Sequence, residues 1–455
     1  MKTWHSLVIA GFIGLGLLLG GGAMAFLRYT EGGVEELLRD PRYTNDRTER
    51  LIVMLDGVPY ETMDALWQQG YFRIFPRPSR VIAPFPSMTD VSAAEIWGAE
   101  PPEGYESLYF DRAGNALRGG AGTYLRKRAL RNADYHRKLD YVEPRAYEFA
   151  AYGFPERIFR ADLRRFLLAY TACRRPVFTA FLKSTDAVAH IGGEELLKKA
   201  LVQLDMVLRA IARARAGRLE ITLFSEHGNQ WIRPRRADVN GHLRRHGFRV
   251  RDRLDARDER AVVIPDFGLV GYMALYAMPS ARRRVAEALA EMEEVALVAY
   301  ADGEDVVVLG GGGVARISYD RRRGRFRYEA QRGDPLGLKR IAEQMTRRGE
   351  MPEDGYIADA VWFKALAAHS YPDALFRLYH GVHGLVKNRA DVLVSFRDGF
   401  VSGRRAFQAY DRLIPIVAIH GGIGAAQSVG FFMSTAGEAP PYLRAEMVRA
   451  YLERR

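Results

Sequence analysis

Seven polar side chains of this 455-residue chain follow segments that read as buried strands, where their chemistry could be combined. Carboxylates gathered at one place repel one another unless cations lie between them, and mixed carboxylate and imidazole ligands suit Zn²⁺ best, with Mn²⁺ as the competitor. Seven such groups are about what two divalent ions need, and two ions can polarise a phosphoryl oxygen and hold a leaving oxygen. The residues are Asp56, Thr89, Asp186, His190, Glu226, His227 and His420.

The one hydroxyl of this set lies in the stretch PFPSMTDVSAAEIWG, residues 84–98. Two prolines hold the chain extended, and the small residues from Val91 favour a helix. A helix N-terminus suits an anion because it presents free N–H groups and partial positive charge. Thr89 could therefore attack phosphorus there. The alternative is an N-cap, a role that we assign to Ser87 or Ser92.

The elements that must position these residues alternate between strands and helices. The apolar run RLIVMLDGVP (50–59) predicts a buried parallel strand, and residues 175–192 and 219–229 repeat the pattern. Residues 194–217 form an amphipathic helix. The fold class is therefore α/β, with a mainly parallel sheet sandwiched by helices. Strand-like segments return at 390–400 and 414–435.

Residues 236–385 do not continue this alternation of strands and helices, and their pattern predicts an inserted small α+β cap. Gly310 to Gly313 precede a strand, so they predict a hairpin turn rather than a phosphate loop. We divide the chain into 1–25, a signal peptide or N-terminal anchor; 26–47, a linker; 48–235, the first part of the core; 236–385, the inserted cap; 386–435, the second part of the core; and 436–455, a polar C-terminal tail with a short helix.

Charge and cysteine content narrow the class of protein. The formal net charge is +12, which favours anionic partners, while no zinc-finger spacing or RNA-binding signature points to specific nucleic acid. The single cysteine, Cys173, excludes an intramolecular disulfide and a cysteine-based zinc cluster. Residues 1–25 combine Lys2, an apolar run and Ala-Met-Ala, typical of a cleaved signal. We expect export to the periplasm or outside the cell, with a membrane anchor as the alternative.

Taken in order, the motifs resemble the alkaline phosphatase superfamily, and most of all its type I phosphodiesterase/nucleotide pyrophosphatase branch. LIVMLDGVP resembles the opening strand of that branch, PSMTDVS its nucleophile loop, STDAVAH its D-x-x-x-H motif, FSEHG its S-D-H-G motif and IHGG its late histidine motif. The resemblance covers about 48–235 and 386–435, and the insertion matches only in placement.

The resemblance implies roles for each candidate residue. Asp186, His190 and His420 would bind one metal ion, and Asp56, Thr89 and His227 the other. Thr89 would be the nucleophile and Ser92 a side chain that orients the phosphate. Two positions depart from the family pattern, because Glu226 stands where the family has aspartate and Ser92 where diesterases have asparagine. His380 and His383 compete with His420 as the late ligand, and we choose His420.

The resulting hypothesis is an exported hydrolase of phosphoric esters that acts through a covalent phosphothreonine with two divalent metal ions. Phosphodiesters, nucleotide pyrophosphates and phosphonates are all open as substrates, as small molecules or lipids. The absence of the C/S-x-P-x-R context argues against a sulfatase. The alternatives are a membrane-anchored phosphotransferase acting on lipid or glycan, and a binding protein with a degraded metal site, which Glu226 would explain. The oligomeric state stays open.

Overall fold

The computed structural model describes residues 45–120, 134–144, 147, 151, 153–403 and 415–454. The signal or anchor predicted at 1–25 and most of the linker predicted at 26–47 lie outside these residues. Within the described part of the chain, no helix is both long and apolar enough to cross a membrane.

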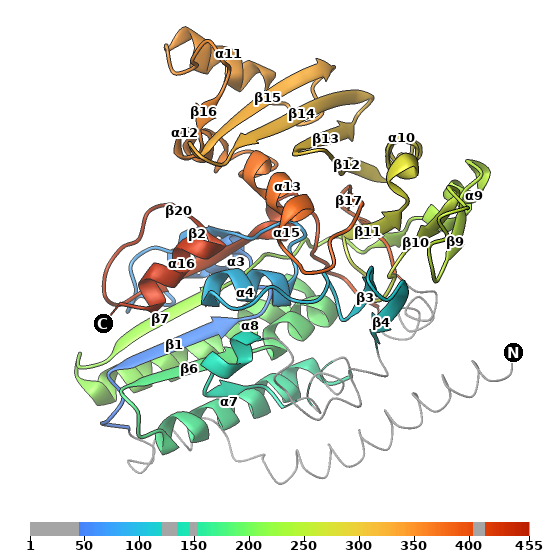
Figure 1. Ribbon diagram of the computed structural model, residues 1–455. Helices are drawn as coiled ribbons and strands as arrows, with labels where there is room; N and C mark the ends of the chain where they lie inside the picture. The colour runs from blue at the N-terminus through green and yellow to red at the C-terminus, as the bar shows by residue number, and fades with distance from the viewer. Residues whose placement is uncertain are drawn as a thin grey trace, which may run out of the picture.

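A seven-stranded sheet forms the core of the molecule (Figure 1). In spatial order its strands are β20 (Tyr442–Arg444), β2 (Ser79–Ile82), β19 (Val429–Ser434), β7 (Glu220–Ser225), β1 (Arg50–Leu55), β6 (Val177–Leu182) and β5 (Tyr141–Val142). The run from β7 through β1 and β6 to β5 is parallel throughout. Only β19 is antiparallel to its neighbours β7 and β2. The predicted α/β class with a mainly parallel sheet is confirmed.

The two faces of this sheet are apolar because successive strand residues point to opposite sides. Along β1, Leu51, Val53 and Leu55 join one hydrophobic cluster, and Ile52 and Met54 join another on the opposite face. Helices α3 (Tyr60–Gln68), α7 (Pro155–Ala172) and α8 (Ser184–Arg215) cover the first face, and α4 (Thr89–Trp97) and α16 (Ala445–Leu452) the second. Burying each large apolar side chain contributes roughly 1.5–3 kcal/mol, so both helical layers stabilise the sheet.

The central strands end level with one another, which determines where the following residues lie. Leu55 at the end of β1 is paired with Leu182 of β6 and with Ser225 of β7. Because β19 is antiparallel, its first residue lies at the same edge, and the loop that carries His420 leads into it. Strand β2 runs parallel to β7 and leads to Thr89. All the candidate residues therefore lie at one edge of the sheet.

A second sheet of nine strands is inserted into the core and lies above it in Figure 1. In spatial order its strands are β16 (Ile357–Ala358), β15 (Arg325–Arg332), β14 (Gly313–Asp320), β13 (Asp305–Gly310), β12 (Val295–Asp302), β17 (Val392–Phe396), β11 (Tyr272–Ala277), β10 (Ala261–Val263) and β9 (Arg249–Arg251). The accompanying helices are α9 (Val239–Arg245), α10 (Arg282–Ala290), α11 (Lys339–Arg347), α12 (Asp359–Leu366) and α13 (Ala374–His383). We call the elements from α9 to β17 the nine-stranded module.

The nine-stranded module corrects two expectations about the insertion. It is α+β as predicted, but it is not small, because its sheet has more strands than the core sheet among the described residues. The strand predicted at 390–400 as part of the core is β17, which lies between β12 and β11. All five of its residues are buried, and such an apolar run looks the same in either sheet. The hairpin predicted at Gly310 to Gly313 is confirmed, with Gly311 and Gly312 at positive φ.

The C-terminal segment predicted as a polar tail is part of the core. The predicted short helix is present as α16, and β20 before it forms the edge strand of the seven-stranded sheet. The remaining elements are the hairpin β3 (Leu108–Asp111) with β4 (Ala116–Gly119), the pair β8 (Arg235–Arg236) with β18 (Phe400–Val401), the turns η2 (Asp134–Lys138) and η3 (Pro279–Ala281), and the short helix α15 (Ala425–Ser428).

Candidate metal centre

Thr89 is the first residue of α4, and its hydroxyl is not used to cap the helix. The residue before it, Met88, is extended, and the helix has no side-chain cap. The capping role predicted for Ser87 or Ser92 is therefore wrong. Ser87 Oγ donates instead to the carbonyls of Pro84 (3.2 Å) and Gly422 (2.9 Å), and Ser92 lies inside the helix. The first N–H groups of α4 consequently keep their capacity to bind an anion.

The first group of possible ligands combines one carboxylate with two imidazoles. Asp186 and His190 lie one turn apart at the start of α8, on a helix rather than at a strand end, and His190 Nε2 is 3.0 Å from Asp186 Oδ2. His420 joins them with ligand atoms within 4.8 Å of one another. His190 Nδ1 donates to the carbonyl of Ala418 (2.5 Å), and His420 Nδ1 to that of Ser87 (2.9 Å). Each Nε2 is therefore left as the ligand atom.

The second group contains Asp56, Glu226 and His227. His227 Nε2 lies 3.6 Å from Asp56 Oδ1 and 3.4 Å from Glu226 Oε1, and its Nδ1 donates to the carbonyl of Gly228 (2.9 Å). The hydroxyl of Thr89 donates to Asp56 Oδ1 (3.1 Å) and lies 3.3 Å from His227 Nε2. The extra methylene of Glu226 thus does not remove its carboxylate from this group.

The two groups are direct neighbours. The rings of His227 and His420 stack with centroids 4.0 Å apart and planes tilted by 22°. Gly57 passes between the groups: a Cβ there would lie 2.6 Å from Asp186 Oδ1 and 3.2 Å from His227 Cε1. The structure therefore brings all seven predicted residues together, in two adjacent sets of ligand atoms with one hydroxyl beside the second set.

The charges of these groups are strongly perturbed. Burial, followed by the charge of Asp186, raises the pKa of Asp56 to about 7. Burial and the nearby Asp56 raise the pKa of Glu226 well above its usual range, and burial lowers the pKa of His227 to about 3. Burial opposes charge on Asp186 and His190 as well, but their mutual attraction lowers the pKa of Asp186 and raises that of His190 to about 9. Carboxylates this close and this buried favour bound cations.

Buried atoms without partners test whether the residues fit metal ions. Glu226 is fully buried, and its Oε1 has no hydrogen-bond partner among the described residues. An orphaned carboxylate oxygen is costly unless a cation fills the gap. Each group also offers the mixture of carboxylate and imidazole that Zn²⁺ prefers. The donor sets therefore fit two divalent ions. Ser92 Oγ, one turn after Thr89, is likewise buried and without a partner among the described residues.

Asn229 is a site residue that the sequence analysis does not single out. It is buried, and its Nδ2 donates to the carbonyl of Gly57 (2.7 Å) and to Asp186 Oδ1 (3.2 Å). It therefore fixes a ligand of the first group to the segment that separates the two groups. Its position directly after His227-Gly228 is the signal that could have indicated it.

The competing histidines lie elsewhere. His380 and His383 are on α13 in the nine-stranded module and belong to neither ligand group. His242 lies on α9 and His246 directly follows that helix, and the two form a separate and more exposed set with Glu291. The structure therefore places His420, and neither His380 nor His383, beside Asp186 and His190.

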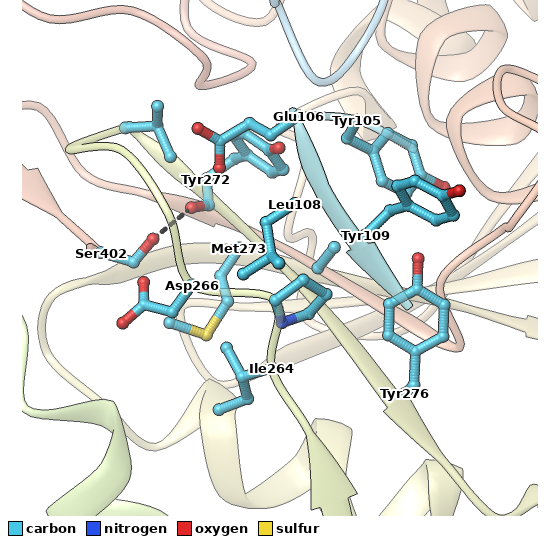
Figure 2. A pocket seen from close by; sticks show the side chains of 13 residues that line it. Tyr105, Glu106, Leu108, Tyr109, Ile264, Asp266, Tyr272, Met273, Tyr276 and Ser402 are labelled. Atoms are coloured by element: carbon cyan, nitrogen blue, oxygen red, sulfur yellow. Dashed lines mark hydrogen bonds between the residues drawn. The ribbon is translucent and has the colours of Figure 1, made fainter. Parts of the chain in front are cut away.

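A cavity of about 10 Å³ lies beside the loop of His420 but contains none of the seven residues (Figure 2). Tyr272 is in contact with that loop, since a Cβ at Gly421 would lie 3.0 Å from its ring, and its carbonyl accepts a bond from Ser402 Oγ (2.8 Å). A volume of this size holds about one water molecule, so it is too small for a phosphoric ester. Its polar lining includes Tyr105, Tyr109, Tyr272, Tyr276, Glu106 and Asp266.

Fold and site together define an α/β protein with a candidate two-ion centre at the edge of its sheet. Among solved structures, the chain is similar to phosphonoacetate hydrolase from Sinorhizobium meliloti 1021, with 13% identity and a TM-score of 0.46 over 89% of this chain and 95% of that one. It is also similar to human ectonucleotide pyrophosphatase/phosphodiesterase 5, with 10% identity and a TM-score of 0.45 over 89% and 94%. No protein-family model and no curated protein matches the chain. Identities this low transfer no residue role and no substrate, so the chemistry rests on the atoms of this site.

Proposed function

We propose that this chain is a metal-dependent hydrolase of phosphoric esters, related to the phosphodiesterase/nucleotide pyrophosphatase branch of the alkaline phosphatase superfamily. One observation carries the proposal: the Thr89 hydroxyl lies at the N-terminus of α4 and contacts Asp56 and His227 of the second ligand group. Thr89 therefore combines a contact to two side chains of this ligand group with a place at the first residue of a helix.

Two divalent ions, Zn²⁺ or its competitor Mn²⁺, would be held by the two groups. Asp186, His190 and His420 would bind one ion, and Asp56, Glu226 and His227 the other, with Thr89 beside it. When bound, the ions would polarise the phosphoryl oxygens and favour ionisation of the hydroxyl.

The residues of the chain orient the reacting atoms. Asp56 accepts the hydrogen bond of Thr89, which aims the oxygen and provides an acceptor for its proton. The Thr89 oxygen bonds to phosphorus while the bond to the ester oxygen breaks, and the released alcohol takes up a proton. Water then adds to phosphorus, the bond to Thr89 breaks and the hydroxyl is regenerated. The free N–H groups of α4 and the unpartnered Ser92 Oγ are placed to hold phosphate oxygens.

Hydrolysis of an aryl phosphodiester and an aryl phosphomonoester tests the proposal. Wild type should be active, chelator should remove the activity, and Thr89→Ala should fall to background. Thr222→Ala is the control, because Thr222 is a more deeply buried threonine on β7 whose hydroxyl bonds to Ser434 and contacts neither ligand group. Acid quenching during turnover should trap one phosphate on the Thr89 peptide. Equal rates for Thr89→Ala and wild type would exclude the nucleophile assignment.

The natural substrate and the location are further parts of this proposal. A panel of phosphodiesters, nucleotide pyrophosphates and phosphonates, ranked by kcat/KM, would select the class of substrate. Export through residues 1–25 is tested by the N-terminus of the protein expressed in full: cleavage after Ala25 supports a signal peptide, and an intact segment in the membrane fraction supports an anchor.

A further inference from the structure

Helix α13 of the nine-stranded module contributes a buried guanidinium that contacts the loops of Thr89 and His420. Arg377 is 2% exposed. Its Nη1 donates to the carbonyls of Ile423 (2.8 Å) and Pro372 (3.0 Å), and its Nη2 to Ser87 Oγ (3.2 Å) and the carbonyl of Pro84 (3.5 Å). One side chain therefore binds two loops that are more than three hundred residues apart in sequence.

Both loops carry residues of the proposed site. Ser87 comes two residues before Thr89, and Ile423 three residues after His420. The loops are also joined to each other: His420 Nδ1 donates to the Ser87 carbonyl (2.9 Å), and the Ser87 N–H to the Gly421 carbonyl (3.2 Å). Arg377 therefore bonds to both loops where they meet.

Burying a cationic side chain costs desolvation free energy. Burial lowers the pKa of Arg377 to about 9, and the carboxylate of Asp373, the residue before α13, is bound by Arg444. An apolar side chain of the same volume would avoid this cost. What an apolar side chain could not do is donate to both loops at once, because that requires the planar fork of a guanidinium.

We propose that Arg377 is a positioning residue that holds the Thr89 loop and the His420 loop in register and thereby couples the nine-stranded module to the metal centre. This inference rests on the proposed function. Arg377 does not bind substrate, since both of its terminal nitrogens are already occupied by protein acceptors. Its effect passes through Ser87 to Thr89 and through Ile423 to His420.

The test compares Arg377→Ala with Arg215→Ala. Arg215 is also buried, and it donates to the carbonyl of Thr48 at the opposite edge of the sheet (3.0 Å). Both variants lose a buried guanidinium bound to backbone, so both lose thermal stability. Only Arg377→Ala should lose kcat, by about 10–100-fold, the range for residues that orient metal ligands. Millimolar guanidinium chloride should restore part of that kcat in Arg377→Ala and leave Arg215→Ala unchanged.

A second readout separates this inference from the proposed function. Titration with Co²⁺, followed by visible absorption, reports the ligand geometry without any ester substrate. Arg377→Ala should bind Co²⁺ about 10–100-fold more weakly than wild type at the first group and give an altered spectrum, with Arg215→Ala matching wild type. A wild type that binds Co²⁺ but hydrolyses no ester would defeat the proposed function, and the Co²⁺ comparison would still decide the role of Arg377.

The conservative variant keeps the proposal testable if Arg377→Ala does not fold. Arg377→Lys retains the charge but cannot reach Ser87 and Ile423 together, so it should fold and still lose kcat and Co²⁺ affinity. Ser87→Ala, which removes one acceptor, should show a smaller loss of the same kind. If Arg377→Ala or Arg377→Lys matches Arg215→Ala in kcat and in the Co²⁺ spectrum, the residue is only structural and the inference is overturned.

Discussion

Replacing Gly57 with alanine should disable the metal centre without altering any proposed ligand. Gly57 follows Asp56 directly and has φ +64°, in the left-handed region. Its missing side chain is what allows the two ligand groups to approach each other. An added Cβ would lie 2.6 Å from Asp186 Oδ1 and 2.7 Å from Asn229 Nδ2, so a single methyl group presses on the first group from inside the site.

The expected loss of unfolding free energy in Gly57→Ala has two parts. The left-handed conformation costs an alanine roughly 1–2 kcal/mol. The Cβ also lies roughly 0.8 Å inside the shortest ordinary contact of 3.4 Å, and overpacking of this kind costs about 1–3 kcal/mol. We therefore expect Gly57→Ala to lose about 2–5 kcal/mol of unfolding free energy. If Asp186 moves by most of that distance, kcat should fall by about 100-fold.

Gly303 provides the matched control. It has the same φ of +64°, and nothing lies within 4 Å of its would-be Cβ. Gly303→Ala therefore measures the backbone cost alone, about 1–2 kcal/mol, and should keep wild-type kcat. Urea unfolding, metal content per chain and aryl ester hydrolysis are measured for both variants and wild type.

Two results would refute the reasoning about Gly57. Retention of full metal content and kcat in Gly57→Ala would mean that the two groups do not depend on close approach at this residue. An equal loss of kcat in Gly303→Ala would mean that the effect is one of general stability and not of the site.

Three further predictions concern single side chains. Glu226→Gln keeps the shape of the side chain but removes its charge, so metal analysis should show about one ion per chain in place of two, and an unchanged content would argue against Glu226 as a ligand. Asn229→Ala removes the bonds to Gly57 and Asp186 and should weaken Co²⁺ binding about 10–100-fold by absorption titration; wild-type affinity would contradict this. Burial lowers the pKa of His380 to about 4. The unfolded chain takes up this proton near pH 6.5 and the folded chain only near 4, so stability falls as the pH drops between these values. His380→Phe should therefore lose about 2 kcal/mol less than wild type between pH 7 and 5 in urea unfolding; equal losses would exclude this contribution.

The strand-end residues could be predicted because local sequence determines them. The buried runs of β1 and β7 end in polar residues, and parallel strands share one edge, so Asp56 and Glu226 had to lie close together. Asp186 and His190 were expected on the same edge, and they reach it on a helix, since a spacing of four residues is about one helical turn. A kink at Gly193 then separates that first part of α8 from its amphipathic remainder.

Strand order could not be predicted, because it is decided by tertiary packing. Nothing in the run VLVSF of β17 distinguishes a place in the core sheet from a place between β11 and β12. The antiparallel direction of β19 is equally invisible in the sequence, although it is what brings His420 to the edge. Arg377 reads as an ordinary polar residue of an amphipathic helix. Its burial is decided by carbonyl groups of loops far away in sequence.

Buried ion pairs between the core and the nine-stranded module bear on how a substrate would reach the proposed site. Arg444 of β20 belongs to the core and donates to Asp359 and Asp373, which come from α12 and the start of α13 in the nine-stranded module. Separating the module from the core would break these hydrogen-bonded ion pairs. Opening the module as a rigid body would also pull Arg377 away from the loops of Thr89 and His420. Because Thr89 is partly exposed while most ligands are buried, a phosphoric ester would reach the hydroxyl from the solvent side with the module in place. Under the proposed function, the module would act on the chemistry through the position of the loops, and α13 would be the element through which a change in the module reaches Thr89.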